Sequence, residues 1–250
     1  MCIQSPLEQF SILPLISFSF SFVDISITNA VLTTLLCLGS FGFLYYSLSF
    51  FGLTIVPARW QLFLENLYEI AAGLIWDSVG FKGQKYFPFI FVIFLFVLLS
   101  NVSGLAPYSF TTTSHLAQTM VLAYTVFIGV MIICAGVHGF HMLSLFLPGG
   151  TSLGLAFLLV PIEVISYIFK PVSLGVRLFA NMMAGHTLLK VIVGFAWSML
   201  CSGGLLLIVH ILPLGVLIIL FGLELAVALI QAYVFTILSC IYINDALVLH

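Results

Sequence analysis

The sequence predicts an all-α polytopic membrane protein that forms a single membrane domain over residues 1–250. Hydrophobic residues make up 63% of the chain and charged residues only 6%, whereas soluble domains carry about 25% charged residues. Apolar runs recur that reach the roughly 20 residues needed by a spanning helix. One further segment has the acidic and apolar faces of a helix that lies on a membrane surface. We therefore expect upright transmembrane helices, a surface amphipathic helix and a C-terminal hairpin of two long inclined helices.

Three apolar runs predict the upright spans, at residues 27–50, 86–104 and 116–143. The stretch between the last two, residues 106–115 (APYSFTTTSH), is polar but uncharged. Asn101–Ser103 matches the N-glycosylation pattern, but it lies at the end of a predicted span, where the pattern has no expected use.

Residues 57–78 predict the amphipathic helix. Pro57 suits the first turn of a helix. An amphipathic helix on the membrane surface fits this segment better than a transmembrane span. A helix packed on another protein domain is the alternative. The apolar face would hold Trp60, Phe63, Leu64, Leu67, Ala71, Leu74 and Ile75, and the acidic face Glu65, Glu69 and Asp77.

The positive charges around this segment predict its side of the membrane. Arg59, Lys82 and Lys85 all lie in the loop that holds the amphipathic helix. By the positive-inside rule, this loop faces the negative, proton-poor side, and the N-terminus lies on the other side.

Two much longer apolar stretches follow, at residues 153–200 and 205–243. As continuous helices they would measure about 70 Å and nearly 60 Å, whereas the hydrocarbon core is about 30 Å thick. Each stretch therefore either breaks into two spans or lies strongly inclined. Pro161, Pro171 and Pro213 permit kinks, and Ser202–Gly204 reads as the turn between the stretches.

Polar residues in these two stretches predict a functional site, because ionisable groups are costly inside a membrane. In an antiparallel hairpin folded at residue 204, position n faces roughly position 408 minus n. The polar residues then form three levels, with the outer ones about 13 Å and about 21 Å from the middle. The middle level holds Arg177, Asn181 and Gln231, the second holds His186 and Glu224, and the third holds Glu163 and Asp245.

This arrangement predicts proton transfer. Histidine beside glutamate can relay protons near neutral pH, and carboxylates can do the same, but arginine stays protonated. No acid of this chain is expected close to Arg177, since the nearest on its helix, Glu163, is four turns away. We therefore expect two half-paths separated by a fixed positive charge and bridged by a mobile acid on another subunit.

These residues resemble a known family. SLGVRLFANMMAGH at 173–186 is similar to the signature of subunit a of F-type ATP synthase in its mitochondrial form. The resemblance covers nearly the whole chain. Its other segments are SPLEQF, NVSGLAPYSFTTTSH, GFHMLSLFLPGGTS, VPIEVISYIFKPV, ELAVALIQAYVF and YINDA.

The resemblance implies a proton-translocating stator subunit, with no catalysis of its own, and a place in the mitochondrial inner membrane or, alternatively, an alphaproteobacterial plasma membrane. Its implied partners are the subunit c ring, the peripheral stalk, other membrane subunits of the synthase and lipid. It implies that Arg177 faces the ring carboxylates beside Asn181 and Gln231. His186 and Glu224 match the outer half-channel, and Glu163 and Asp245 the matrix-side path.

Some polar residues of the chain have a second possible role, and some ligands are not expected. His186 with Glu224 can also hold a divalent metal, and His115 is a candidate for the mouth of the outer path. Lys170 and Lys190 are expected to snorkel or pair rather than relay. No phosphate-binding glycine motif occurs, so we expect no bound nucleotide. The net charge of -2 is too small to suggest nucleic acid as a partner, and no cofactor is expected. A self-contained ion-coupled transporter is the alternative function, although the chain lacks the expected repeat.

Overall fold

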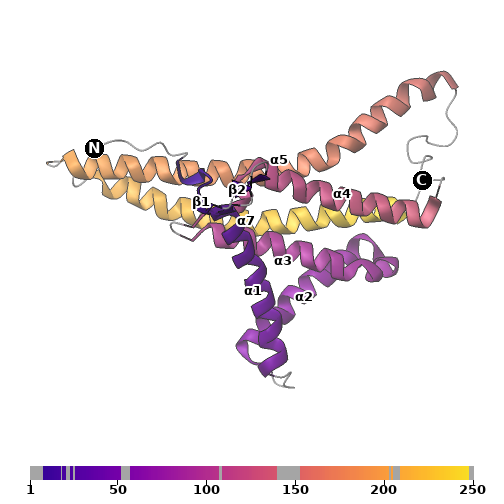
Figure 1. Cartoon of the computed structure of the whole chain (residues 1–250), viewed down its shortest axis with the longest axis horizontal. Helices are drawn as coiled ribbons and strands as arrows, with labels where there is room; N and C mark the ends of the chain where they lie inside the picture. The colour runs from indigo at the N-terminus through magenta and orange to yellow at the C-terminus, as the bar shows by residue number, and fades with distance from the viewer. Residues whose placement is uncertain are drawn as a thin grey trace. The chain divides into compact units, whose positions relative to one another are not determined.

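The computed structural model describes residues 8–17, 19–20, 23–24, 26–51, 57–106, 109–139, 153–202, 204 and 209–247. Within them the chain is overwhelmingly helical, which confirms the predicted all-α class (Figure 1). The α-helices are α1 (Asn29–Phe51), α2 (Arg59–Ser78), α3 (Phe87–Gly104), α4 (Leu116–His138), α5 (Leu153–Ser202) and α7 (Ile211–Leu247). Short 3₁₀ helices are η1 (Glu8–Phe10), η2 (Gly80–Tyr86) and η3 (Thr112–Ser114).

Five helical segments in the described part are long and apolar enough to cross a membrane, which fits the predicted multi-pass protein. They are Asn29–Ser47, Gly80–Gly104, Leu116–His138, Phe157–Ser202 and Ile211–Leu247. The last two form single helices of 50 and 37 residues, α5 and α7, rather than two spans each. Pro161 and Pro171 lie inside α5. The end of the predicted span 116–143 and part of the predicted turn at 202–204 lie outside the described residues.

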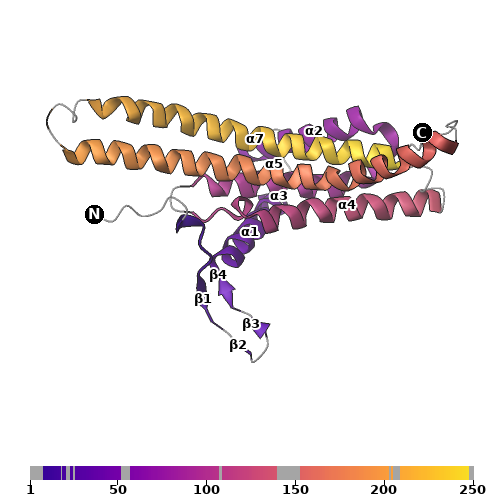
Figure 2. The same cartoon turned by 90° about the horizontal axis from the view of Figure 1, so that it is seen from above.

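Short strands precede α1 in the described part of the chain, where the sequence predicted no strand. β1 (Pro14–Ile16) pairs antiparallel with β4 (Ile27–Thr28), as Figure 2 shows just ahead of α1. β2 (Ser19–Phe20) pairs with β3 (Val23–Asp24). Ser and Phe alternate along residues 17–22, and this period of two is that of a strand. Asn29 ties the strands to α1, since its Nδ2 donates to the Ser11 carbonyl oxygen at 3.1 Å.

The chain folds as two compact units. One contains residues Met1–Phe43, Phe96–His115 and Leu178–Ala232, and is called the first unit below. The other, the second unit, contains Leu44–Leu95, Leu116–Arg177 and Tyr233–His250.

The core of the second unit joins four helices. Ile75 of α2, Ile90 of α3, Val130 and Cys134 of α4, and Cys240, Ile243 and Ala246 of α7 form one buried cluster. α2 contributes a narrow buried face to this unit. Its buried residues are Ala71, Leu74 and Ile75, whereas Trp60 and Phe63 are exposed, as are Glu65, Glu69 and Asp77.

In the first unit, α5 and α7 lie side by side along the part they contribute to it, and both views show this (Figures 1 and 2). Leu178 and Met182 of α5 and Ala228 and Ala232 of α7 are fully buried or nearly so. Small residues on α7 let two helices approach closely, which is how helices associate in membranes. This contact brings polar side chains of the two helices within hydrogen-bonding distance.

Candidate functional site

His186 and Glu224 form a buried pair in the first unit. Nδ1 of His186 on α5 lies 3.3 Å from Oε1 of Glu224 on α7, and their side chains are 15% and 5% exposed. A carboxylate this deeply buried is costly unless a partner compensates it. Histidine is a partner that gains and loses a proton near neutral pH, so the pair can hold one proton in more than one position.

Gly185 makes the space that Glu224 occupies. A Cβ at position 185 would lie 2.7 Å from Glu224 Oε1 and 3.0 Å from its carboxyl carbon. Any larger residue would therefore push the carboxylate away from α5. On the other side of the pair, the Phe10 ring of η1 lies 6.4 Å from the His186 ring.

A second polar level lies between the same two helices. Asn181 Nδ2 donates to Gln231 Oε1 at 2.9 Å, and Gln231 is buried. The antiparallel arrangement of α5 and α7 in this unit agrees with the predicted hairpin, but the register differs. His186 meets Glu224 itself rather than residue 222, and Asn181 meets Gln231 where the predicted register has residue 227.

Asn101 is a residue of this site that sequence reasoning missed. Its side chain is fully buried, and Nδ2 donates to the Ala228 carbonyl oxygen at 3.2 Å. Ala228 is one helical turn from Glu224 and three residues from Gln231, so Asn101 fixes α7 between the two polar levels. The only sequence signal was one polar residue at the end of an apolar run, and this buried amide is not available for glycosylation.

His115 lies in the first unit between η3 and α4, directly after four buried hydroxyl residues, Thr111–Ser114. Its ring stacks on Phe110, with centroids 5.0 Å apart. Burial lowers the pKa of His115 from its ordinary value of 6.5. His115 is thus a partly buried imidazole in a polar segment that joins two spans.

Arg177 and Glu163 both lie on the part of α5 in the second unit. Arg177 is exposed and Glu163 is half-buried. Within the described residues, no carboxylate lies within ion-pair distance of Arg177. The expectation that this chain supplies no acid to Arg177 therefore agrees with the described part of the structure.

Asp245 does not meet Glu163, and this corrects the predicted third level. Oδ2 of Asp245 lies 3.3 Å from Nζ of Lys170, two turns along α5 from Glu163. The Lys170 ammonium also lies 5.0 Å from the centroid of the Tyr167 ring and 5.3 Å from that of Tyr242. A hairpin with the constant predicted register misses this pair, since that register places residue 238 opposite Lys170. Lys170 therefore pairs with an acid, as one of its two expected settings has it.

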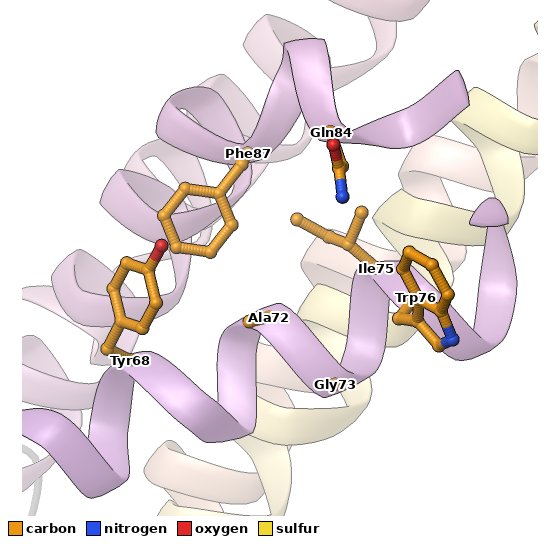
Figure 3. Close-up of a pocket in the computed structure, with 7 residues that line it drawn as sticks. All are labelled: Tyr68, Ala72, Gly73, Ile75, Trp76, Gln84 and Phe87. Carbon is orange, nitrogen blue, oxygen red and sulfur yellow. The ribbon is translucent and has the colours of Figure 1, made fainter. Parts of the chain in front are cut away.

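A pocket of about 600 Å³ lies in the second unit (Figure 3). It lies between α2 and the start of α3, and Tyr68 and Phe87 pack together at one end, with ring centroids 4.7 Å apart. None of the predicted site residues is among those that line it, which are Tyr68, Ala72, Gly73, Ile75, Trp76, Gln84 and Phe87.

Comparison with known proteins gives a consistent result over the whole chain. A family model described as the ATP synthase A chain matches residues 27–244, a range that ends one residue before Asp245. ATP synthase subunit a of Pylaiella littoralis is 73% identical over 246 residues, covering 98% of this chain and 99% of that protein. The Chondrus crispus subunit is 51% identical over 249 residues, covering 99% and 98%. That of the bacterium Rhodospirillum rubrum is 47% identical over 246 residues, covering 98% and 99%.

Proposed function

Since the chain belongs to the ATP synthase subunit a family, the proton-translocating stator subunit of F-type ATP synthase, we propose that it forms two offset half-paths for protons, separated by Arg177. The observation that carries the proposal is the pair of polar levels between α5 and α7 in the first unit, His186 with Glu224 and Asn181 with Gln231. Arg177 follows at the next turn of α5.

The first half-path runs by way of Glu224 and His186. A buried carboxylate whose neighbour is an imidazole can accept a proton from water and pass it on. Asn101 holds α7 at this depth through the Ala228 carbonyl. His115, in the polar segment before α4, is the proposed mouth of this half-path.

Arg177 is the proposed barrier between the half-paths. Its guanidinium stays protonated, so it repels a proton that would pass directly from one half-path to the other. It also favours the ionised form of a carboxylate placed against it. Its exposure on α5 and the absence of a described carboxylate near it support a partner acid on another subunit. We propose that this acid belongs to the subunit c ring.

The second half-path leads past Glu163, and Asp245 of α7 contacts Lys170, seven residues along α5 from Glu163. Glu163 shares a face of α5 with Arg177, fourteen residues away, because seven residues make nearly two complete turns. A proton released near Arg177 can therefore reach this carboxylate along one side of the helix. Each proton that crosses 100 mV supplies roughly 2.3 kcal/mol, and the subunit converts this into one-way rotation of the ring.

The proposed location is the mitochondrial inner membrane, with the peripheral stalk and other membrane subunits of the synthase as further partners. The resemblance of residues 173–186 to the signature of the mitochondrial form supports this location. Co-purification of the tagged chain with mitochondrial inner-membrane markers and a small proteolipid tests it. Recovery without either would contradict it.

The proposal is tested by replacing Arg177 with Gln in the assembled complex reconstituted in vesicles. We expect proton-driven ATP synthesis to fall below detection while assembly persists, because the barrier charge is gone. Lys190→Gln is the matched control, since it removes another cation from α5 outside the proposed path. Normal coupled synthesis in Arg177→Gln would overturn the proposal.

A further inference from the structure

Lys170 occupies an unusual setting in the second unit. Its side chain is 31% exposed, its ammonium contacts Asp245 at 3.3 Å, and the rings of Tyr167 and Tyr242 lie 5.0 Å and 5.3 Å from it. Aromatic rings attract a cation through their negative faces. Two rings and one carboxylate from two helices therefore hold the ammonium in a defined position.

Lys170 lies on α5 between the two residues that the second half-path connects, so its charge can affect protons that move between them. Lys170 lies seven residues after Glu163 and seven before Arg177. Seven residues correspond to about 10 Å and nearly two full turns, so all three side chains leave the same face of α5. A proton that moves from the region of Arg177 to Glu163 must pass Lys170.

A lysine ammonium without a partner would oppose that movement. At an effective dielectric constant of about 20, a bare cation about 10 Å away lowers the occupancy of a proton site roughly tenfold. A carboxylate in contact with the ammonium cancels most of this field, because the pair acts as a dipole rather than a charge. The Asp245 carboxylate contacts the Lys170 ammonium at 3.3 Å and so cancels most of its field.

We propose that Asp245 is a positioning residue that acts through Lys170: it neutralises the ammonium and so keeps the way from Arg177 to Glu163 open to protons. Asp245 is therefore not itself a relay. This inference rests on the proposed function, since it concerns the second half-path. It separates two roles that the sequence analysis assigned together to Glu163 and Asp245.

Three variants of the reconstituted complex test the inference: Asp245→Asn, Lys170→Gln and the two combined. Proton-driven ATP synthesis and passive proton conduction are measured per assembled complex. We expect Asp245→Asn to lose roughly five- to tenfold, because it leaves the Lys170 charge bare. The combined variant should recover most of that loss, because the charge to be neutralised is also gone. Asp77→Asn on the exposed face of α2 is the matched control.

Two results would overturn the inference. If the combined variant stays as low as Asp245→Asn, Asp245 carries protons itself. If Asp245→Asn alone conducts and synthesises normally, the Lys170 charge has no effect on the path. A purely structural role of the pair predicts loss of assembled complex, with normal rates per complex that remains, and this too is contrary to the inference.

The charge-swapped variant Lys170→Asp/Asp245→Lys keeps the inference testable if an unpaired charge prevents assembly. It retains both charges and their contact, so we expect it to assemble and to synthesise faster than Asp245→Asn. A relay at position 245 predicts the opposite, since lysine there stays charged. Arg177→Gln is measured in the same series. Its failure to block synthesis would refute the proposed function, whereas loss of recovery in the combined variant, with Arg177→Gln inactive, would refute only this inference.

Discussion

Two carboxylates of α7 have a basic partner on α5 at the same distance, yet the two pairs differ in chemistry. In the first unit Glu224 lies 3.3 Å from His186, and in the second Asp245 lies 3.3 Å from Lys170. Glu224 is 5% exposed and Asp245 43%. The buried carboxylate has the partner that can lose its proton near neutral pH, and the more accessible one has a partner with a permanent charge.

An ion-pair distance alone therefore does not identify a proton relay. An imidazole and a carboxylate can share one proton, so the pair can change its charge state as protons pass. An ammonium and a carboxylate in contact stabilise each other's charge, so the pair resists a change in charge state. The predictions below test whether function follows this distinction.

Replacement of Glu224 by Gln is expected to have the largest effect. The amide keeps the size of the side chain but can neither accept nor release a proton. Proton flux through the reconstituted complex should fall roughly hundredfold, which is the typical loss when a proton-transfer group is removed. Assembly should persist, and Glu69→Gln on the exposed face of α2 is the control. Unchanged flux would remove Glu224 from the path.

Replacement of Gly185 by Ala is expected to have an intermediate effect on proton flux. It changes no charge but displaces the Glu224 carboxylate. The new Cβ would lie 2.7 Å from Glu224 Oε1, so the carboxylate must move away from His186. We expect proton flux to fall about tenfold, since a small displacement of a reacting group costs up to a hundredfold. Gly194→Ala on the same helix is the control, because its Cβ meets nothing within 4 Å among the described residues. Equal flux in the two variants would show that the close contact does not matter.

The smallest expected effect concerns His115, which lies outside the spans. Burial lowers its pKa from the ordinary value of 6.5, so the folded state binds a proton less readily than the unfolded state. The stability that neutral His115 contributes is therefore complete above pH 6.5 and is lost as pH falls below it. His115→Gln should reduce the drop in melting temperature of the solubilised complex between pH 7.5 and pH 5.5. An identical pH dependence in both proteins would contradict this assignment.

The sequence predicted the fold class, and the reason is physical. Long apolar runs have few alternatives to helices in a membrane, because every backbone polar group must be satisfied within the segment. The pairing of His186 with Glu224 was also predictable, since both lie near the turn at residue 204 and register errors accumulate with distance from it. Lys170 with Asp245 lies farther from the turn, beyond Pro171, and there a constant register failed.

Other features left little or no signal in the sequence. Asn101 donates to a backbone carbonyl of a residue 127 positions away, and carbonyls are the same at every position. The space for Glu224 depends on Gly185, one of 20 glycines in the chain. By contrast, the distance in sequence between Arg177 and the nearest acid of α5, Glu163, was readable, because acids are so rare in this chain that each can be followed individually.

The two pairs are compared most directly by proton-driven ATP synthesis in two double variants, measured side by side in the reconstituted complex. His186→Gln/Glu224→Gln removes the pair with an exchangeable proton, and Lys170→Gln/Asp245→Asn removes the pair with permanent charges. We predict that the first lowers synthesis roughly hundredfold, whereas the second retains most of it because no bare charge remains. Equal losses in the two variants, or a larger loss in the second, would contradict the assignment of proton exchange to His186 and Glu224 rather than to Lys170 and Asp245.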